Sequence, residues 1–192
     1  MLILSFRAYF RLFYKTEVKG LENIPKDGPL IIACNHLSNF DPILAGGQTE
    51  TRRGNVYFVK KEIPAWPLIG WVFRGYKFIA VDRKRPGGDL GALKTALKTI
   101  KKGGSLFIFP EGTRSKTGKP GRAKQGIGFL VYNSGAQVVP VKVFNTDKLP
   151  FTRRVKMVVG KPFKIQPQEG REVKEQYQDF ADKVMQEINK LD

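Results

Sequence analysis

The feature of this sequence that most constrains its fold is the regular alternation of short apolar runs with helical segments. Six runs rich in Ile, Val and Phe have the length and composition of buried strands: Pro29–Cys34, Val56–Val59, Lys77–Val81, Ser105–Phe109, Val138–Val143 and Val155–Val159. Helices are expected between them, at Asp41–Gly47, Trp66–Phe73, Gly88–Lys101 and Lys124–Ser134. This alternation predicts an α/β fold with a largely parallel central sheet flanked by helices.

The length of 192 residues suits one domain, and the sequence has no internal repeat, low-complexity tract or linker. We therefore predict a single domain over residues 1–192, with its chemically distinctive motifs between residues 20 and 161. The tail predicts a C-terminal helix over residues 169–191. One face of that helix carries apolar residues that we interpret as core packing: Val173, Tyr177, Phe180, Val184, Ile188 and Leu191.

The charge of the chain is unusual, because 34 Lys and Arg residues face 17 Asp and Glu residues, for a formal net charge of +17. Such an excess predicts anionic partners: nucleic acid, an acidic membrane surface, or phosphorylated and acyl-carrier substrates. The single cysteine excludes an intrachain disulfide, and the single histidine excludes zinc sites that need several imidazoles. No metal site is expected.

Residues 1–16 predict an interfacial amphipathic helix. Arg7, Arg11 and Lys15 would form one basic stripe, and the opposite side would be largely apolar, with Leu2, Phe6, Tyr9, Phe10 and Phe13. The arginines interrupt the run well before the roughly 20 apolar residues that a spanning helix needs. No signal-peptide cleavage site follows it. The alternative is an amphipathic helix packed against its own domain.

The first motif that carries chemistry is Asn35–Pro42 (NHLSNFDP), directly after the first predicted strand. Catalytic groups in open α/β sheets gather at the carboxyl ends of strands, where the only histidine, His36, is placed. Asp41 with Pro42 resembles a helix start, and its carboxylate could turn back to accept the Nδ1–H of His36, leaving Nε2 as a base. Alternatively, Asp41 only caps the helix and His36 is a satisfied strand-end residue. Cys34 lies inside the apolar strand and is interpreted as a buried, inert thiol.

The second motif is Phe109–Ser115 (FPEGTRS), again just past a predicted buried strand. A glycine between a carboxylate and an arginine suits a loop whose backbone N–H groups face a ligand. Arg114 offers a planar fork of donors that matches phosphate. No acidic residue occurs from Arg114 through Lys142. A solvated basic loop would explain the lysines of this stretch but explains the motif less well.

Together these motifs resemble the glycerolipid acyltransferase family, most closely its 1-acylglycerol-3-phosphate acyltransferases. Further blocks agree in order and spacing: Lys60–Ile63, Pro67–Trp71, Val81–Arg83, Lys124–Gly126 and Val139–Val141. The resemblance covers Gly20 to about Lys161, which is most of the chain.

The resemblance implies a reaction and a set of roles. His36 would be the general base that takes the proton from the free sn-2 hydroxyl of 1-acylglycerol 3-phosphate, and Asp41 would orient it. The donor would be an acyl thioester of coenzyme A or acyl carrier protein, the product phosphatidic acid, and no metal or redox cofactor would be needed. The glycerol phosphate would be held by Glu111, Gly112, Thr113 and Arg114, helped by Lys60 and Arg83. Backbone N–H groups near Gly112 could also face the thioester oxyanion.

The same resemblance implies a membrane lipid as acceptor and an anionic membrane surface as partner. We expect a peripheral or monotopic protein on the cytoplasmic face of the cell membrane. Whether Ile63–Phe73 inserts into lipid or packs in the core stays open. One alternative function is a sister acyltransferase that uses another glycerophosphate or lysophospholipid acceptor. A nucleic-acid-binding protein is less favoured, because the sequence contains no recognition motif of that class.

Overall fold

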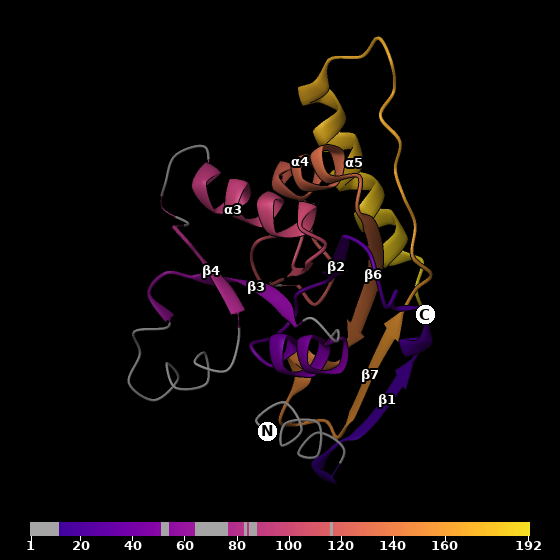
Figure 1. The fold of residues 1–192 in the computed structure, drawn as a ribbon. Coiled ribbons are helices and arrows are strands. Elements are labelled where there is room, and N and C mark those ends of the chain that lie inside the picture. The colour runs from indigo at the N-terminus through magenta and orange to yellow at the C-terminus, as the bar shows by residue number, and fades with distance from the viewer. Residues whose placement is uncertain (1–11, 51–53, 64–76, 83, 85–87, 116) are drawn as a thin grey trace.

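The computed structural model describes residues 12–50, 54–63, 77–82, 84, 88–115 and 117–192. Within these ranges the chain forms one seven-stranded sheet with the strand order β1-β7-β6-β2-β5-β3-β4 (Figure 1). The strands are β1 Lys15–Lys19, β2 Leu30–Cys34, β3 Asn55–Lys60, β4 Lys77–Val81, β5 Ser105–Ile108, β6 Gln137–Phe144 and β7 Arg154–Val159. All six predicted strands are present, and none of their ends differs by more than one residue from the expected one.

The sheet is mostly parallel. β4, β3, β5, β2 and β6 pair in parallel, as do β1 and β7, and only β6 and β7 pair antiparallel. β2 lies at the centre, and all five of its residues are buried, as expected for a strand covered on both faces. The predicted α/β fold with a largely parallel sheet is confirmed.

The strand register brings the two chemical motifs to one edge of the sheet. Phe107 in β5 pairs with Ile32 in β2 on one side and with Tyr57 in β3 on the other. The carboxyl ends of these three parallel strands therefore stop at nearly the same level. Lys60 at the end of β3 and the segments after β2 and β5, which carry His36 and Glu111, therefore lie along the same edge.

Three long helices cover one face of the sheet: α3 Leu90–Lys101, α4 Gln125–Ser134 and α5 Val173–Asn189. α4 lies between the other two, and α3 lies at the outer end of this layer near β4 (Figure 1). Their buried faces meet the sheet in one apolar cluster that includes Ile100, Leu130 and Val184. A second cluster on the opposite face includes Leu44 of the π-helical turn η2, Pro42–Gly46, packed with Phe107 and Val139.

The N-terminal prediction needs correction where the structure describes it. Lys15 is the first residue of β1 and pairs with Arg154, so it does not continue a helical basic stripe. Leu12 and Phe13 are helical and exposed, whereas residues 1–11 lie outside the described ranges. An edge strand was missed because KTEVK has one apolar residue, and its strand geometry comes from pairing with β7. No helix within the described ranges combines the length and the apolar character needed to cross a membrane.

The start of α3 follows from local chemistry, and two other predicted helices have different outcomes. α3 begins at Leu90 because the Asp89 side chain caps it, accepting the N–H of Ala92 at 3.0 Å. The C-terminal helix is present and packs on the core as expected, but it spans Val173–Asn189 rather than residues 169–191, so Leu191 lies beyond its end. Val173 at its first position is 41% exposed, so its predicted core role is wrong. The predicted helix Trp66–Phe73 lies outside the described residues.

Candidate active site

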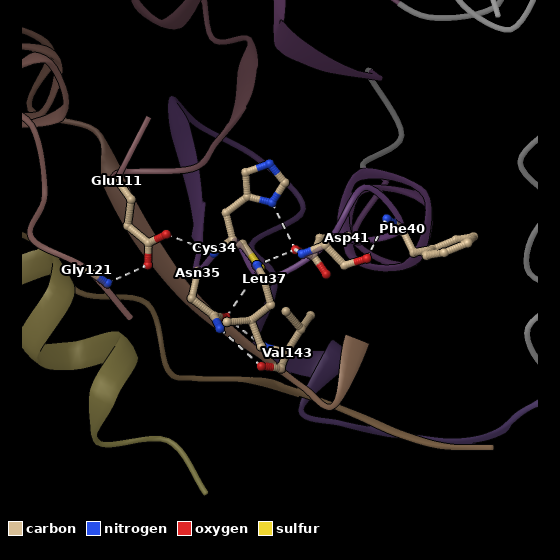
Figure 2. A network of polar contacts seen from close by, with 10 residues as sticks. Cys34, Asn35, Leu37, Phe40, Asp41, Glu111, Gly121 and Val143 are labelled. Atoms are coloured by element: carbon tan, nitrogen blue, oxygen red, sulfur yellow. Dashed lines mark hydrogen bonds and ion pairs between the residues drawn. The ribbon is translucent and has the colours of Figure 1, made fainter. Parts of the chain in front are cut away.

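The structure places His36 and Asp41 in direct contact. His36 follows β2, Asp41 directly precedes η2, and His36 Nδ1 lies 2.9 Å from Asp41 Oδ2 (Figure 2). With Nδ1–H donating to the carboxylate, Nε2 keeps its lone pair, and it forms no hydrogen bond with the described part of the chain. The contact expected from the sequence is present, and it leaves the imidazole in the tautomer that a general base needs.

Asp41 is completely buried, and the chain folds around its carboxylate. Oδ2 also accepts the backbone N–H groups of Leu37 and Ser38, both at 2.6 Å. Asp41 is the N-cap residue of η2 and Pro42 is its first residue, as predicted, but the Asp41 side chain makes no hydrogen bond into η2 and instead serves the preceding turn. Oδ1 is buried and has no hydrogen-bond partner among the described residues.

The segment after β5 holds His36 in three ways. The ring of Phe109 stacks on the imidazole, with centroids 3.9 Å apart and planes within 14°. The His36 N–H donates to Glu111 Oε2 at 3.3 Å, and the His36 carbonyl accepts the N–H of Ser115 at 2.8 Å. Ring orientation and backbone position are thus both set from β5, although the two motifs are separated by about 70 residues in the chain.

Glu111 is buried and is occupied by backbone groups. Its Oε2 accepts the His36 N–H, and its Oε1 accepts the N–H of Gly121 at 3.1 Å (Figure 2). Burial raises the pKa of Glu111 above its ordinary value of 4.5, and the two backbone hydrogen bonds partly oppose that rise. Only 5% of this residue is exposed, so its geometry is that of a positioning residue that joins two loops.

Asn35 anchors the other side of the motif. Its side-chain amide pairs with both the N–H and the carbonyl of Val143 in β6, at 2.8 and 3.1 Å. The Asn35 side chain thereby continues the pairing between β2 and β6 just past the end of β2, where the backbone leaves the sheet and leads to His36. Cys34 is fully buried, and burial raises the pKa of its thiol well above the ordinary value, as expected for an inert thiol.

Gly112 makes the turn of the second motif possible. Its φ of +69° lies in the left-handed region that favours glycine, and its N–H closes the turn onto the Phe109 carbonyl at 3.0 Å. A Cβ at this position would come within 3.0 Å of Cδ and Cε of Lys124. The exposed Lys124 side chain therefore lies over the motif, a cation that motif spacing alone did not assign to this site.

The exposed residues of the motif are Thr113 and Arg114. Arg114 directly precedes Ser115, which is bonded to His36, yet its guanidinium has no hydrogen bond or ion pair with the described residues. Lys60 ends β3 one strand away, and its Nζ lies 3.8 Å from Glu62 Oε2. Arg83 lies outside the described residues. Within the described ranges, His, Cys, Asp and Glu residues form no group of three that could hold a metal ion.

Comparison with known proteins fits this geometry. The acyltransferase family model matches residues 15–143, which hold both motifs and the strands that carry them. The chain belongs to the acyltransferase family. The match contains β2, β5 and the whole of the His36 and Glu111 environment, so the resemblance of the motifs is confirmed at the level of the family.

Two relatives and one solved structure illustrate the similarity. The chain is 36% identical over 140 residues to the chloroplast 1-acyl-sn-glycerol-3-phosphate acyltransferase BAT2 of Brassica napus, covering 71% of this chain and 39% of that protein. It is 36% identical over 126 residues to the 1-acyl-sn-glycerol-3-phosphate acyltransferase of Pseudomonas aeruginosa, covering 65% and 48%. The matched segments span less than half the length of these relatives.

The fold is also similar to that of a solved structure. The 1-acyl-sn-glycerophosphate acyltransferase PlsC of Thermotoga maritima superposes with a TM-score of 0.69 over 98% of this chain and 79% of that chain. The two sequences are 24% identical, so this likeness bears on the fold, which it supports along almost the entire chain.

Proposed function

We propose that this chain transfers a fatty acyl group from an acyl thioester to the sn-2 hydroxyl of 1-acylglycerol 3-phosphate, forming phosphatidic acid. The observation that carries the proposal is the buried His36–Asp41 pair held beside a loop that exposes Arg114. A base and an exposed guanidinium on adjoining segments suit an acceptor that bears a hydroxyl and a phosphate. The names of the relatives support the same acceptor.

In the proposed reaction, Nε2 of His36 takes the proton of the acceptor hydroxyl as its oxygen attacks the thioester carbonyl carbon. Asp41 stabilises the imidazolium that forms, and the stacked ring of Phe109 offers a π-face to the same cation. The tetrahedral intermediate collapses, its carbon–sulfur bond breaks, and the imidazolium returns the proton to the departing thiolate. Coenzyme A and acyl carrier protein are both chemically suitable leaving groups.

Phosphate binding is assigned to the exposed cations. Arg114 can form a bidentate contact, and Lys124, whose stem packs over Gly112, adds a point charge on the same loop. Lys60, at the end of β3, and Arg83 remain predicted contributors. Because the Gly112 N–H is used within its turn, the N–H groups of Thr113 and Arg114 are the better donors for the developing oxyanion.

The acceptor and the product are bilayer lipids, so we propose that the protein works at a membrane surface as a peripheral or monotopic protein. Extracting a lipid into water would cost about 0.8 kcal/mol for each exposed methylene. Working at the surface avoids most of that cost. The cytoplasmic face of the cell membrane and an anchoring role for residues 1–11 are parts of this proposal.

The test is a substrate panel with the purified chain in detergent. Acyl-CoA and acyl carrier protein thioesters are each offered 1-acylglycerol 3-phosphate, glycerol 3-phosphate or a lysophosphatidylcholine, and products are quantified by mass spectrometry. We expect phosphatidic acid to dominate and to vanish with His36→Ala. Preference for another acceptor would reassign the chain to a sister acyltransferase activity, and no transfer from either donor would overturn the proposal.

A further inference from the structure

The outer face of α3 is an unusual surface because its charge is all of one sign. Lys94, Lys98, Lys101 and Lys102 are exposed, and their spacing of four, seven and eight residues places them along one side of the helix. α3 contains no acidic residue, and none of the four lysines forms an ion pair with another residue that the structure describes. The opposite side of α3, including Ala96 and Ile100, is buried against the core.

α5 shows that such a surface is not a necessary property of a helix in this chain. There Lys183 and Lys190 both pair with Glu187, at 2.9 and 2.8 Å. Lys183 within α5 and Lys190 at its C-cap thus both lie beside a carboxylate of the same helix. Four unpaired lysines on α3 repel one another, which lowers stability slightly and favours any anionic partner that relieves the repulsion.

The shape and composition of the α3 face narrow the class of partner. The four lysines and Leu97 line a shallow depression of about 330 Å³, and Leu90, one turn before Lys94, is 63% exposed. From Leu90 to Lys102 the face extends about 18 Å at 1.5 Å per residue. Lysine stems lying beside leucines, with ammonium groups free to reach outward, suit a broad anionic surface with apolar material beneath it.

We propose that the α3 face is a docking surface for an anionic lipid bilayer. α3 starts after the carboxyl end of β4, so Leu90 lies at the edge of the sheet that also carries His36, and α3 is outermost in its helical layer (Figure 1). The Leu90 end of the docked face would therefore lie at the edge of the sheet that carries the candidate active site, and Lys102 would lie near the opposite edge, where Gly104 pairs with Leu30. The inference rests on the proposed function in one respect, that a lipid acceptor brings a membrane to this protein.

The first experiment measures binding to vesicles of phosphatidylcholine with and without 30% phosphatidylglycerol, a fraction of roughly the size that gives a surface potential of tens of millivolts. The variant Lys94→Glu/Lys98→Glu/Lys101→Glu is compared with the control Lys161→Glu/Lys164→Glu/Lys174→Glu, which changes the net charge equally at exposed positions elsewhere. We expect the α3 variant to lose at least about tenfold in affinity for anionic vesicles, and the control at most about threefold. Equal losses would overturn the proposal, because binding would then follow net charge alone.

A second experiment reports which face meets the lipid. Because Cys34 is buried, an environment-sensitive maleimide dye can be directed to Leu90→Cys or, as a control, to Val173→Cys at the exposed start of α5. We expect a blue shift on anionic vesicles for the dye at position 90 and none at position 173. The reverse pattern, or binding of an acidic protein to α3 without vesicle binding, would overturn the proposal.

A third measurement, acyl transfer to an acceptor dispersed in detergent, distinguishes failure of the docking proposal from failure of the proposed function. The α3 variant should keep wild-type transfer under those conditions, since its lysines lie outside the candidate active site. A wild-type chain that docks on vesicles through α3 but transfers no acyl group would refute the proposed function and leave the docking surface standing.

Discussion

The segments that follow β2 and β5 start at the same edge of the sheet but differ in how much of their polar surface is internally satisfied. In the first, Asn35 and Asp41 are buried, and Oδ2 of Asp41 accepts two N–H groups of its own turn. The second begins in the same way, with Glu111 bound to two backbone amides, but then opens at Thr113 and Arg114, which are exposed.

The difference separates two requirements of the proposed chemistry. A base must be held in one tautomer and one orientation, which needs buried partners with fixed geometry. A group that recognises a soluble or membrane-borne phosphate must be reachable and unpaired, which needs exposure. Glu111 and Arg114 are only three residues apart, yet Glu111 is buried and Arg114 is exposed. We therefore expect a variant of Glu111 to change kcat and a variant of Arg114 to change the KM for the acceptor.

The largest effect is expected at the buried pair. His36→Ala should lower kcat by 10²–10⁴-fold or more, because no other imidazole exists in the chain to take the proton. Thermal unfolding should remain cooperative, showing that the loss is chemical. Activity above one tenth of the wild-type value would remove His36 from the catalytic role.

Asp41→Asn should be nearly as severe, with kcat about 10²-fold lower or worse. An amide cannot supply the negative charge that stabilises the imidazolium, and it can hold the ring in the wrong tautomer. The matched control is Asp147→Asn, which removes the same charge at an exposed position. If both variants kept full activity, the buried carboxylate would serve only the turn that it closes.

Arg114→Ala should change acceptor binding rather than kcat, because Arg114 is exposed and the buried pair is left intact. We expect the KM for the acceptor to rise about tenfold or more while the KM for the acyl donor changes little. Arg114→Lys should recover little of this, because a point charge cannot reproduce the bidentate fork. Arg122→Ala is the control, since Arg122 is exposed and its guanidinium pairs with Asp182 at 3.6 Å. Equal effects on donor and acceptor would mean that the loop binds something other than the acceptor phosphate.

Glu111→Gln should lower kcat about tenfold and leave both KM values near those of the wild type. The amide can accept only one of the two backbone N–H groups, so the backbone of His36 loses a charged hydrogen bond worth roughly 1.5–3 kcal/mol. Glu22→Gln, at an exposed position, is the control. A rise in acceptor KM at constant kcat would instead restore Glu111 to the substrate-binding role expected from the family resemblance.

The smallest expected effect is on stability as a function of pH. Because burial raises the pKa of Glu111 above 4.5, the folded chain retains this proton at pH values where the unfolded chain has released it. The contribution of Glu111 to the free energy of unfolding therefore falls as pH rises from about 4.5 through the raised pKa. Denaturant titrations should show that Glu111→Gln costs most stability at low pH and less near neutrality. A cost that grows with pH would show that the pKa is lowered instead.

Local sequence was sufficient for the parts of this protein that depend on neighbours in the chain. Apolar runs with strand composition mark β2 to β7, and the placement of His36 just past a buried strand locates it at the functional edge. The contact between His36 and Asp41 was also predictable, since a turn of five residues can bring the two side chains together.

Only the tertiary structure decided the partners that come from distant segments. β1 becomes a strand because β7 offers it a free edge, Phe109 meets the imidazole because β5 lies beside β2, and Lys124 covers Gly112 because α4 begins there. The hydrogen bond of Glu111 to the backbone of His36 likewise comes from the fold, while its expected phosphate contact stays a prediction. Hydrogen bonds and ring contacts of this kind depend on strand register and loop closure across about 70 residues, which no local spacing in the sequence encodes.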